Sequence, residues 1–259
     1  MSGLALFWHQ FRYDQKLFWR NPATVFFSVL MPLVFLFLLG AVFGSGEERD
    51  PVYDLLGDQY LVPAIMTLGI VSATFVNMAM TITFQREMGV LKRMRGTPLP
   101  TSMFVTVRTA SAVINASLIA VTILIAGKLA YGVDITATRM VGVAIATVVG
   151  SVVFCALGFA LTIFIPNQSA APAITNGIVL PLYFISGVFG DAANMPETLR
   201  EIGRIFPIYH LGACLFESFS PNATGIAIHW SDLLNLLVWG AIGLIVASMK
   251  FRWEPREGE

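Results

Sequence analysis

The sequence is poor in charged residues. Only 12% of its 259 residues are Asp, Glu, Lys or Arg, whereas 56% are hydrophobic; soluble domains carry about 25% charged residues. A soluble protein of this length could not cover its surface with polar groups. Lipid must therefore replace water over much of the surface, which predicts a membrane protein. The 16 basic residues are balanced by 16 acidic ones, so the composition also excludes the strongly basic surface of a nucleic-acid-binding protein.

The sequence also has few cysteines and lacks a common phosphate-binding motif. The two cysteines, Cys155 and Cys214, lie far apart in apolar surroundings, and we interpret both as packing residues rather than disulfide partners or metal ligands. The sequence has no G-x-x-x-x-G-K-[ST] run, because Gly127-Lys128 is followed by Leu129. We therefore expect this chain to bind no cofactor and to be no enzyme. Any ATP and magnesium would be bound by another polypeptide.

Five long stretches without a charged residue are candidate membrane spans. An α-helix rises ~1.5 Å per residue, so ~20 residues cross a hydrocarbon core of ~30 Å. Four stretches have the length of one span. The fifth, 140–190, is long enough for two and contains at 166–172 the cluster Pro-Asn-Gln-Ser-Ala-Ala-Pro, which favours a chain reversal. The predicted fold class is therefore an all-α membrane protein, a single transmembrane domain over 1–259, with six spans at 22–44, 60–84, 104–127, 140–165, 172–190 and 232–250.

The distribution of basic residues predicts the orientation, because Lys and Arg near span ends stay on the cytoplasmic side. Eleven of the 16 basic residues lie before span one, between spans two and three, just inside span three at Arg108, or from the last residue of span six onward. The acidic cluster in 47–58 falls on the opposite side. We therefore expect a multi-pass protein of a bacterial plasma membrane with both termini in the cytoplasm.

Three segments are neither spans nor short loops. In 1–20, aromatic residues share one helical face and basic residues cluster elsewhere, with partial separation. This favours a helix in the cytoplasmic headgroup layer, although a frayed terminus is the alternative. In 85–100, an apolar edge of Met88, Leu91 and Met94 lies opposite a basic edge. Such a short helix should dock on a cytoplasmic partner or lie on anionic lipid, and the residues leave both open.

The third segment, 191–231, follows the fifth predicted span. Pro196 suits a helix start and Pro207 ends that helix. The apolar run 208–216 is too short to span, so we expect two helices that dip into the outer leaflet and return.

Taken together, these segments resemble the permease subunits of type-2 ATP-binding-cassette exporters, a group that includes bacterial drug, antibiotic and polysaccharide efflux permeases. The resemblance covers nearly the whole chain. Its anchors are Arg20-Asn21-Pro22, Pro32, the glycines and Phe43 of 40–44, the run Arg-Glu-Met-Gly-Val-Leu-Lys-Arg-Met-Arg-Gly-Thr-Pro-Leu-Pro at 86–100, and Phe-Pro-Ile-Tyr-His at 206–210. The run at 86–100 is the most specific, although many relatives carry a different small residue at Gly96.

The resemblance implies roles for all three segments. Segment 1–20 would be an interfacial connecting helix, 85–100 a coupling helix in a cleft of a cytoplasmic ATPase subunit, and 191–231 a pair of outer re-entrant helices. Two permeases, either two copies or a copy with a paralogue, would assemble with two ATPases. The residues expected to couple to the ATPase are Glu87, Gly89, Leu91, Lys92, Arg93, Met94, Arg95, Thr97 and Pro98. Those expected to form the outer re-entrant region are Pro196, Leu199, Ile202, Phe206 and Pro207.

Polar residues are rare in the predicted spans, where Asn77, Asn115 and Asn176 supply most of the polarity. Each could form a hydrogen bond between helices or contact a substrate. The lack of charge favours an amphiphilic or hydrophobic substrate, such as a drug, an antibiotic, a lipid-linked compound or a polysaccharide. The alternatives are a secondary transporter without an ATPase, which would typically need ionisable groups in mid-membrane, and a membrane scaffold.

Overall fold

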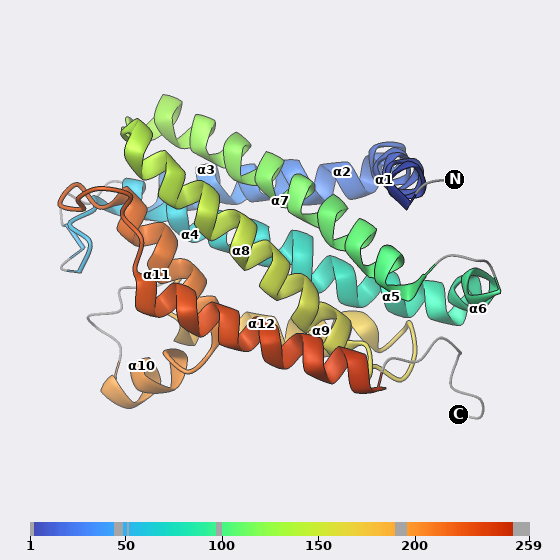
Figure 1. The fold of residues 1–259 in the computed structure, drawn as a ribbon. Helices are drawn as coiled ribbons and strands as arrows, with labels where there is room; N and C mark the ends of the chain where they lie inside the picture. Colours follow the sequence, from blue (N-terminus) through green and yellow to red (C-terminus); the bar gives the residue numbers. More distant parts are fainter. Residues whose placement is uncertain (1–2, 44–48, 51, 97–99, 190–195, 251–259) are drawn as a thin grey trace.

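The computed structural model describes residues 3–43, 49–50, 52–96, 100–189 and 196–250, and its regular elements within these ranges are helices (Figure 1). By length and composition, five helical stretches are suited to cross a membrane. This confirms the all-α membrane fold and corresponds to five of the six predicted spans. The five stretches are Pro22–Val42, Gly57–Glu87, Thr101–Tyr131, Ala137–Leu161 and Trp230–Met249.

The predicted span at 172–190 corresponds to a shorter apolar helix, α9 (Ala171–Ile185), of 15 residues. Its length of about 22 Å is less than the ~30 Å of a hydrocarbon core. The helix ends because Gly187 adopts a left-handed conformation with φ of 69°, which terminates helical hydrogen bonding. The count of six spans therefore stays a prediction.

The first two spanning stretches each contain a wide π-helical turn. In the first, α2 (Pro22–Val25) continues through η1 (Phe26–Leu30) into α3 (Met31–Phe43). The Met31 N–H bonds Phe26 O, five residues back, just before Pro32, which has no N–H to donate. In the second, α4 (Gly57–Val71) continues through η2 (Ser72–Val76) into α5 (Asn77–Glu87).

The interior of the bundle is built around α11 (Pro207–Phe219), of whose 13 residues eleven are buried. It packs against α4, α8 (Ala137–Leu161) and α12 (Trp230–Lys250). Glycines bring α8 and α12 close together: a Cβ on Gly243 would lie 3.0 Å from backbone atoms of α8. The apolar run 208–216 is thus a helix, as predicted, and it is buried among other helices.

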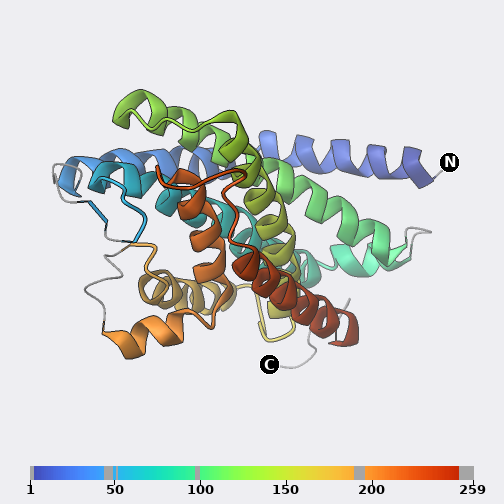
Figure 2. The same cartoon turned by 60° about the vertical axis from the view of Figure 1, so that its left-hand side comes forward.

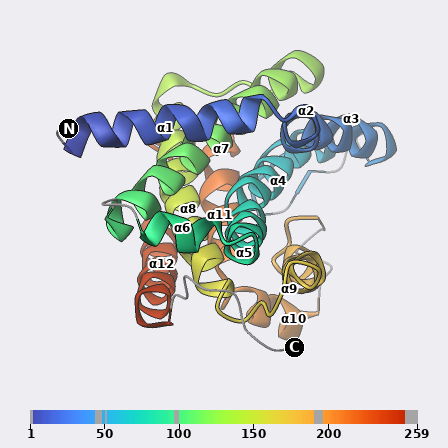
Figure 3. The same cartoon turned by 90° about the vertical axis from the view of Figure 1, so that its right-hand side faces the viewer.

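The remaining elements lie at opposite ends of the bundle. Helix α1 (Gly3–Trp19) crosses one end, which α6 (Val90–Arg95), the turn between α8 and α9, and the last turn of α12 share (Figures 1 and 3). Helix α10 (Glu197–Gly203) lies at the other end (Figures 1 and 2). This separation matches the predicted grouping of segments 1–20 and 85–100, while the side of the membrane on which each end lies stays a prediction.

Candidate functional site

The corner between α5 and α6 is the first candidate site. Helix α5 (Asn77–Glu87) extends through Glu87, and Gly89 then breaks it with a left-handed conformation, φ of 66°. Glycine adopts this conformation without the steric cost that a Cβ brings. The single coupling helix expected over 85–100 is therefore wrong in its extent, since 85–87 belong to the spanning helix. Thr97 and Pro98 lie outside the described residues, as does the side chain of Arg95.

The inner face of α6 is anchored in the protein's own core. Leu91 is fully buried and packs in a cluster with Met78, Ile82, Phe104 and other apolar side chains. Met94 is partly buried against the same cluster. The expectation that Leu91 lies on an apolar edge free to dock on a partner is wrong, because this residue fixes α6 to α5 and α7 (Thr101–Tyr131).

The outer face of α6 is exposed. Met88, Lys92 and Arg93 are all exposed, Met88 with 58% of its surface accessible. Arg93 Nη2 lies 3.4 Å from Met88 O and donates to the end of α5. We refer to these three residues as the α6 outer surface. It presents two positive charges and one flexible apolar side chain at the end of the bundle that also carries α1 (Figure 3).

Arg86 and Glu87, just before the corner, hold the turn between α8 and α9. Arg86 is buried and donates from Nη1 to Thr162 O at 2.8 Å and from Nη2 to Ile165 O at 2.7 Å. The guanidinium thus satisfies carbonyls beyond the end of α8, where a cation is favoured. Glu87 Oε1 accepts the N–H of Gln168 at 2.6 Å. Arg86 and Glu87 therefore join the end of α5 to the turn between α8 and α9.

Sequence reasoning missed this bridge. It treated Arg86 as a topology determinant and expected Glu87 to contact the ATPase, whereas both side chains bond within the chain. The proline-rich turn at 166–172 was visible in the sequence. Nothing in the sequence indicated that this turn bonds to residues some 80 positions earlier.

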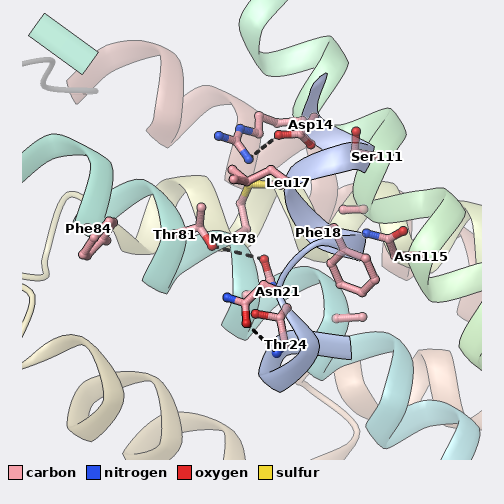
Figure 4. Close-up of a pocket in the computed structure, with 14 residues that line it drawn as sticks. Asp14, Leu17, Phe18, Asn21, Thr24, Met78, Thr81, Phe84, Ser111 and Asn115 are labelled. Carbon is pink, nitrogen blue, oxygen red and sulfur yellow. Dashed lines mark hydrogen bonds and ion pairs between the residues drawn. The ribbon is translucent and has the colours of Figure 1, made fainter. Parts of the chain in front are cut away.

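The second candidate site is a polar cavity of about 310 Å³ beside this corner, partly open and lined by α1, the start of α2, η2, α5 and α7 (Figure 4). Asn77 and Asn115, two of the three asparagines singled out in the sequence, both line it. Asn176 does not: it lies on α9 and is exposed. The residues lining the cavity are Asp14, Leu17, Phe18, Asn21, Thr24, Ala73, Asn77, Met78, Thr81, Phe84, Arg108, Ser111, Ala112 and Asn115.

The charged groups at the cavity neutralise each other. Arg108 Nη1 lies 2.5 Å from Asp14 Oδ1, and both side chains are largely buried. Gln15, the next residue of α1, donates from Nε2 to Ser111 O at 3.3 Å. Sequence reasoning gave Asp14 no role, although it is the single acidic residue among the first 46, and that isolation was the available signal.

The neutral polar side chains of the cavity fall into two groups. Asn77 Oδ1 accepts from Thr81 Oγ1 at 3.2 Å, and Asn21 Oδ1 caps α2 by accepting the Thr24 N–H. Ser111 Oγ and Asn115 Oδ1 are buried and have no hydrogen-bond partner among the described residues. A buried polar atom without a partner costs about 1–3 kcal/mol. Two buried oxygens beside the cavity therefore make no hydrogen bond within the part of the chain that the structure describes.

The predicted outer re-entrant residues divide between exposed and packed positions. Leu199 and Ile202 on α10 are exposed, with 42% and 41% of their surfaces accessible. Pro207 is buried at the start of α11, and Phe206 stacks on Trp239 of α12 at 6.4 Å. Pro196 precedes α10, as expected for a residue at a helix start.

The same end holds a group of ionisable residues that lie apart in the sequence. His210 Nδ1 lies 2.6 Å from one oxygen of the buried Asp232, and His229 Nδ1 lies 3.0 Å from the other. This group ties α11 to the start of α12. Nearby, burial raises the pKa of Tyr53 well above its ordinary value, so this phenol stays protonated at physiological pH. Among the described residues, no set of three or more His, Cys, Asp or Glu side chains is arranged to hold a metal ion.

These features define a multi-pass membrane protein with the long helix α1 and the short helix α6 at the same end. Comparison with known proteins makes the class specific. The family model for the ABC-2 type transporter matches residues 4–219. Because the match covers most of the chain, the protein belongs to the ABC-2 type transporter family, as the resemblance predicted.

Three relatives carry the name of transport permease ycf38. The protein of Pyropia yezoensis is 26% identical over 83% of this chain and 76% of its own length. That of Porphyra purpurea is 24% identical over 92% and 82% of the two chains, and that of Cyanophora paradoxa is 24% identical over 88% and 82%. Their names describe them as transport permeases, which agrees with the membrane class defined by the helices.

Proposed function

We propose that this chain is the permease subunit of an ATP-binding-cassette exporter, driven by a separate ATPase subunit. The observation that carries the proposal is the α5–α6 corner. Its outer surface is exposed and basic, while its base is fixed to the helical core through Leu91. Family membership supports transport, and the absence of a phosphate-binding motif in the sequence leaves the energy source to a partner.

The corner suits the transmission of force. An ATPase that binds Met88, Lys92 and Arg93 would push on α6, and α6 cannot move freely because Leu91 is packed in the core. Arg86 and Glu87 would carry the same displacement to the turn between α8 and α9. The spanning helices would then shift as a group, and this shift would alternately open and close the pathway.

The pathway would form between this permease and a second copy or a paralogue. The first spanning stretch has the smallest buried share of the five, 17%, so lipid or a second permease must cover it. We place the complex in a bacterial plasma membrane with both termini in the cytoplasm. The proposed substrate is amphiphilic or hydrophobic, such as a drug, an antibiotic, a lipid-linked compound or a polysaccharide.

The test is charge reversal on the α6 outer surface. The variant Lys92→Glu/Arg93→Glu should lose binding to the ATPase subunit of the complex, and ATP-dependent transport by the reconstituted complex should fall to background. Thermal unfolding should be unchanged, because both side chains are exposed. Lys128→Glu is the matched control, since Lys128 is an exposed basic residue near the opposite end of α7.

Two results would contradict the proposal. One is full ATPase binding by the double variant with transport intact. The other is transport by the permease alone under an ion gradient without any ATPase, which would make the chain a secondary transporter.

A further inference from the structure

Helix α1 runs across the end of the bundle rather than along it. Figure 1 shows α1 end-on while the spanning helices run across the view, and Figure 3, turned by 90°, shows it lengthwise. Its main contacts within the chain are with α7 and with α2, which follows it. None of its residues is buried. With the spanning helices crossing a bilayer, α1 lies parallel to the membrane plane, and much of its surface is left for something outside the chain.

The face of α1 that packs on α7 takes up the one acidic side chain of the helix. Asp14 pairs with Arg108, and Gln15 donates from Nε2 to Ser111 O at 3.3 Å. Asp14 and Gln15 are half-buried, as is Phe18, one turn after Asp14. Because Asp14 is neutralised against α7, the exposed side of α1 carries no negative charge.

The exposed side of α1 carries a line of positive charges. Arg12, Lys16 and Arg20 follow one another at intervals of four residues, so each lies about 6 Å further along the helix and about 40° further around it. All three residues are exposed. Within the part of the chain that the structure describes, no carboxylate pairs with any of them. We refer to these three residues as the α1 basic stripe.

Two tryptophans border the α1 basic stripe. Trp8 and Trp19 are eleven residues apart, which is about three helical turns, so they lie almost on one line along the helix, beside Arg12. They are exposed, with 57% and 52% of their surfaces accessible. Water alone would solvate the three cations but would leave both indole rings uncovered. A lipid headgroup layer accommodates both kinds of side chain, because phosphate groups and acyl chains meet there.

We propose that the α1 basic stripe binds the phosphate groups of anionic lipids in the leaflet next to α1, with Trp8 and Trp19 placed among the same lipids. Guanidinium and ammonium groups suit phosphate oxygens. Each basic residue near an anionic membrane surface strengthens binding about fivefold. Anionic lipid then holds α1 on its exposed side, while the pair of Asp14 with Arg108 holds it on the packed side. This contact is separate from the proposed coupling through α6 and needs no ATPase.

The test is hydrogen–deuterium exchange of the full chain in nanodiscs of dioleoyl phosphatidylcholine, either alone or mixed with dioleoyl phosphatidylglycerol. The backbone amides of α1 should exchange about tenfold more slowly in the mixed nanodiscs, because the anionic lipid opposes the opening of this helix. High salt should remove most of the difference, since the charges involved are exposed. Soluble glycerol phosphate should give no protection, because only a membrane presents phosphates beside the two tryptophans.

A triple variant and a matched control identify the groups that bind. Arg12→Gln/Lys16→Gln/Arg20→Gln should lose the difference between the two kinds of nanodisc. Its thermal unfolding in phosphatidylcholine alone should match that of the wild type, because all three side chains are exposed. Lys92→Gln/Arg93→Gln also removes exposed cations at this end of the bundle, but from α6. This control should keep the slower exchange of α1.

Equal exchange of α1 in the two kinds of nanodisc would overturn the inference, as would protection by soluble glycerol phosphate. An equal loss of protection in the α6 control would assign the attraction to the whole end of the bundle and not to the α1 basic stripe. Protection of α1 by an added ATPase subunit, without any effect of anionic lipid, would assign its exposed side to a protein partner. The first two results would leave the proposed transport function standing, since neither involves transport.

Discussion

Arg108 of α7 and Asp14 of α1 form an ion pair of 2.5 Å in which both side chains are largely buried. The pair joins the helix that crosses the end of the bundle to a spanning helix, and it closes one side of the polar cavity (Figure 4). Phe104, one turn before Arg108, places its ring 5.7 Å from the guanidinium carbon. The position of α1 therefore depends on electrostatics as well as on apolar packing.

We predict that Asp14→Asn and Arg108→Gln each loosen α1 from the bundle. Removing one partner leaves the other charge buried and uncompensated, which costs more than losing the pair as a whole. In a double-mutant cycle, thermal unfolding in nanodiscs should give a coupling energy of about 0.5–3 kcal/mol. Limited proteolysis within 3–19 should be faster in the single variants than in the wild type. Additive effects of the two substitutions would show that the pair contributes nothing to this junction.

A second prediction concerns Arg86. Arg86→Met keeps the apolar stem but leaves the carbonyls of Thr162 and Ile165 without the guanidinium. Hydrogen bonds to a charged group contribute about 1.5–3 kcal/mol each, so the free energy of unfolding should fall by about 3 kcal/mol. The measurement is denaturant or thermal unfolding in nanodiscs. Arg93→Met, on the exposed face of α6, is the control and should change stability by less than about 0.5 kcal/mol. Equal stability of the two variants would contradict the bridge to the turn between α8 and α9.

A third prediction concerns Gly89, whose φ of 66° sets the angle between α5 and α6. Gly89→Ala should lower the free energy of unfolding by about 1–2 kcal/mol, because an L-residue with a Cβ is strained in this conformation. Gly89→Asn should recover part of the loss, since asparagine tolerates the left-handed region better. Gly177→Ala on α9 is the control: no described atom lies within 4 Å of its added Cβ, and its φ is not left-handed. If Gly89→Ala lowered the free energy of unfolding no more than Gly177→Ala does, the predicted backbone strain at Gly89 would be ruled out.

Much of the fold could be predicted from the sequence. Charge-free stretches of the right length located five apolar helices, and Pro196 and Pro207 marked the short helices after α9. Two helix boundaries differ from the expected ones, and both were decided locally but not by hydropathy. Gly187 ends α9 before it reaches the length of a span, and Gly89 divides the segment expected to be one coupling helix.

The candidate sites were predictable only in part. Asn77 and Asn115 were recognised as rare polar residues in apolar helices, but their meeting in one cavity depends on how α5 and α7 pack. Leu91 was correctly seen as apolar, yet whether it faces a partner or the core is set by the direction in which α6 leaves the corner. Asn176 looked equivalent to the other two and lies elsewhere, because α9 packs away from α7.

The sequence by itself determined that this chain belongs in a bilayer, that it is helical, and that it belongs to a transporter family. These properties follow from composition, helix length and a contiguous motif, all of which are local along the chain. Only the tertiary structure decided which isolated charges and amides become partners: Asp14 with Arg108, Arg86 with the carbonyls after α8, His210 with Asp232. In an apolar interior a polar group must find a partner wherever the packing brings one, and these partners lie 22 to 94 positions apart in the sequence.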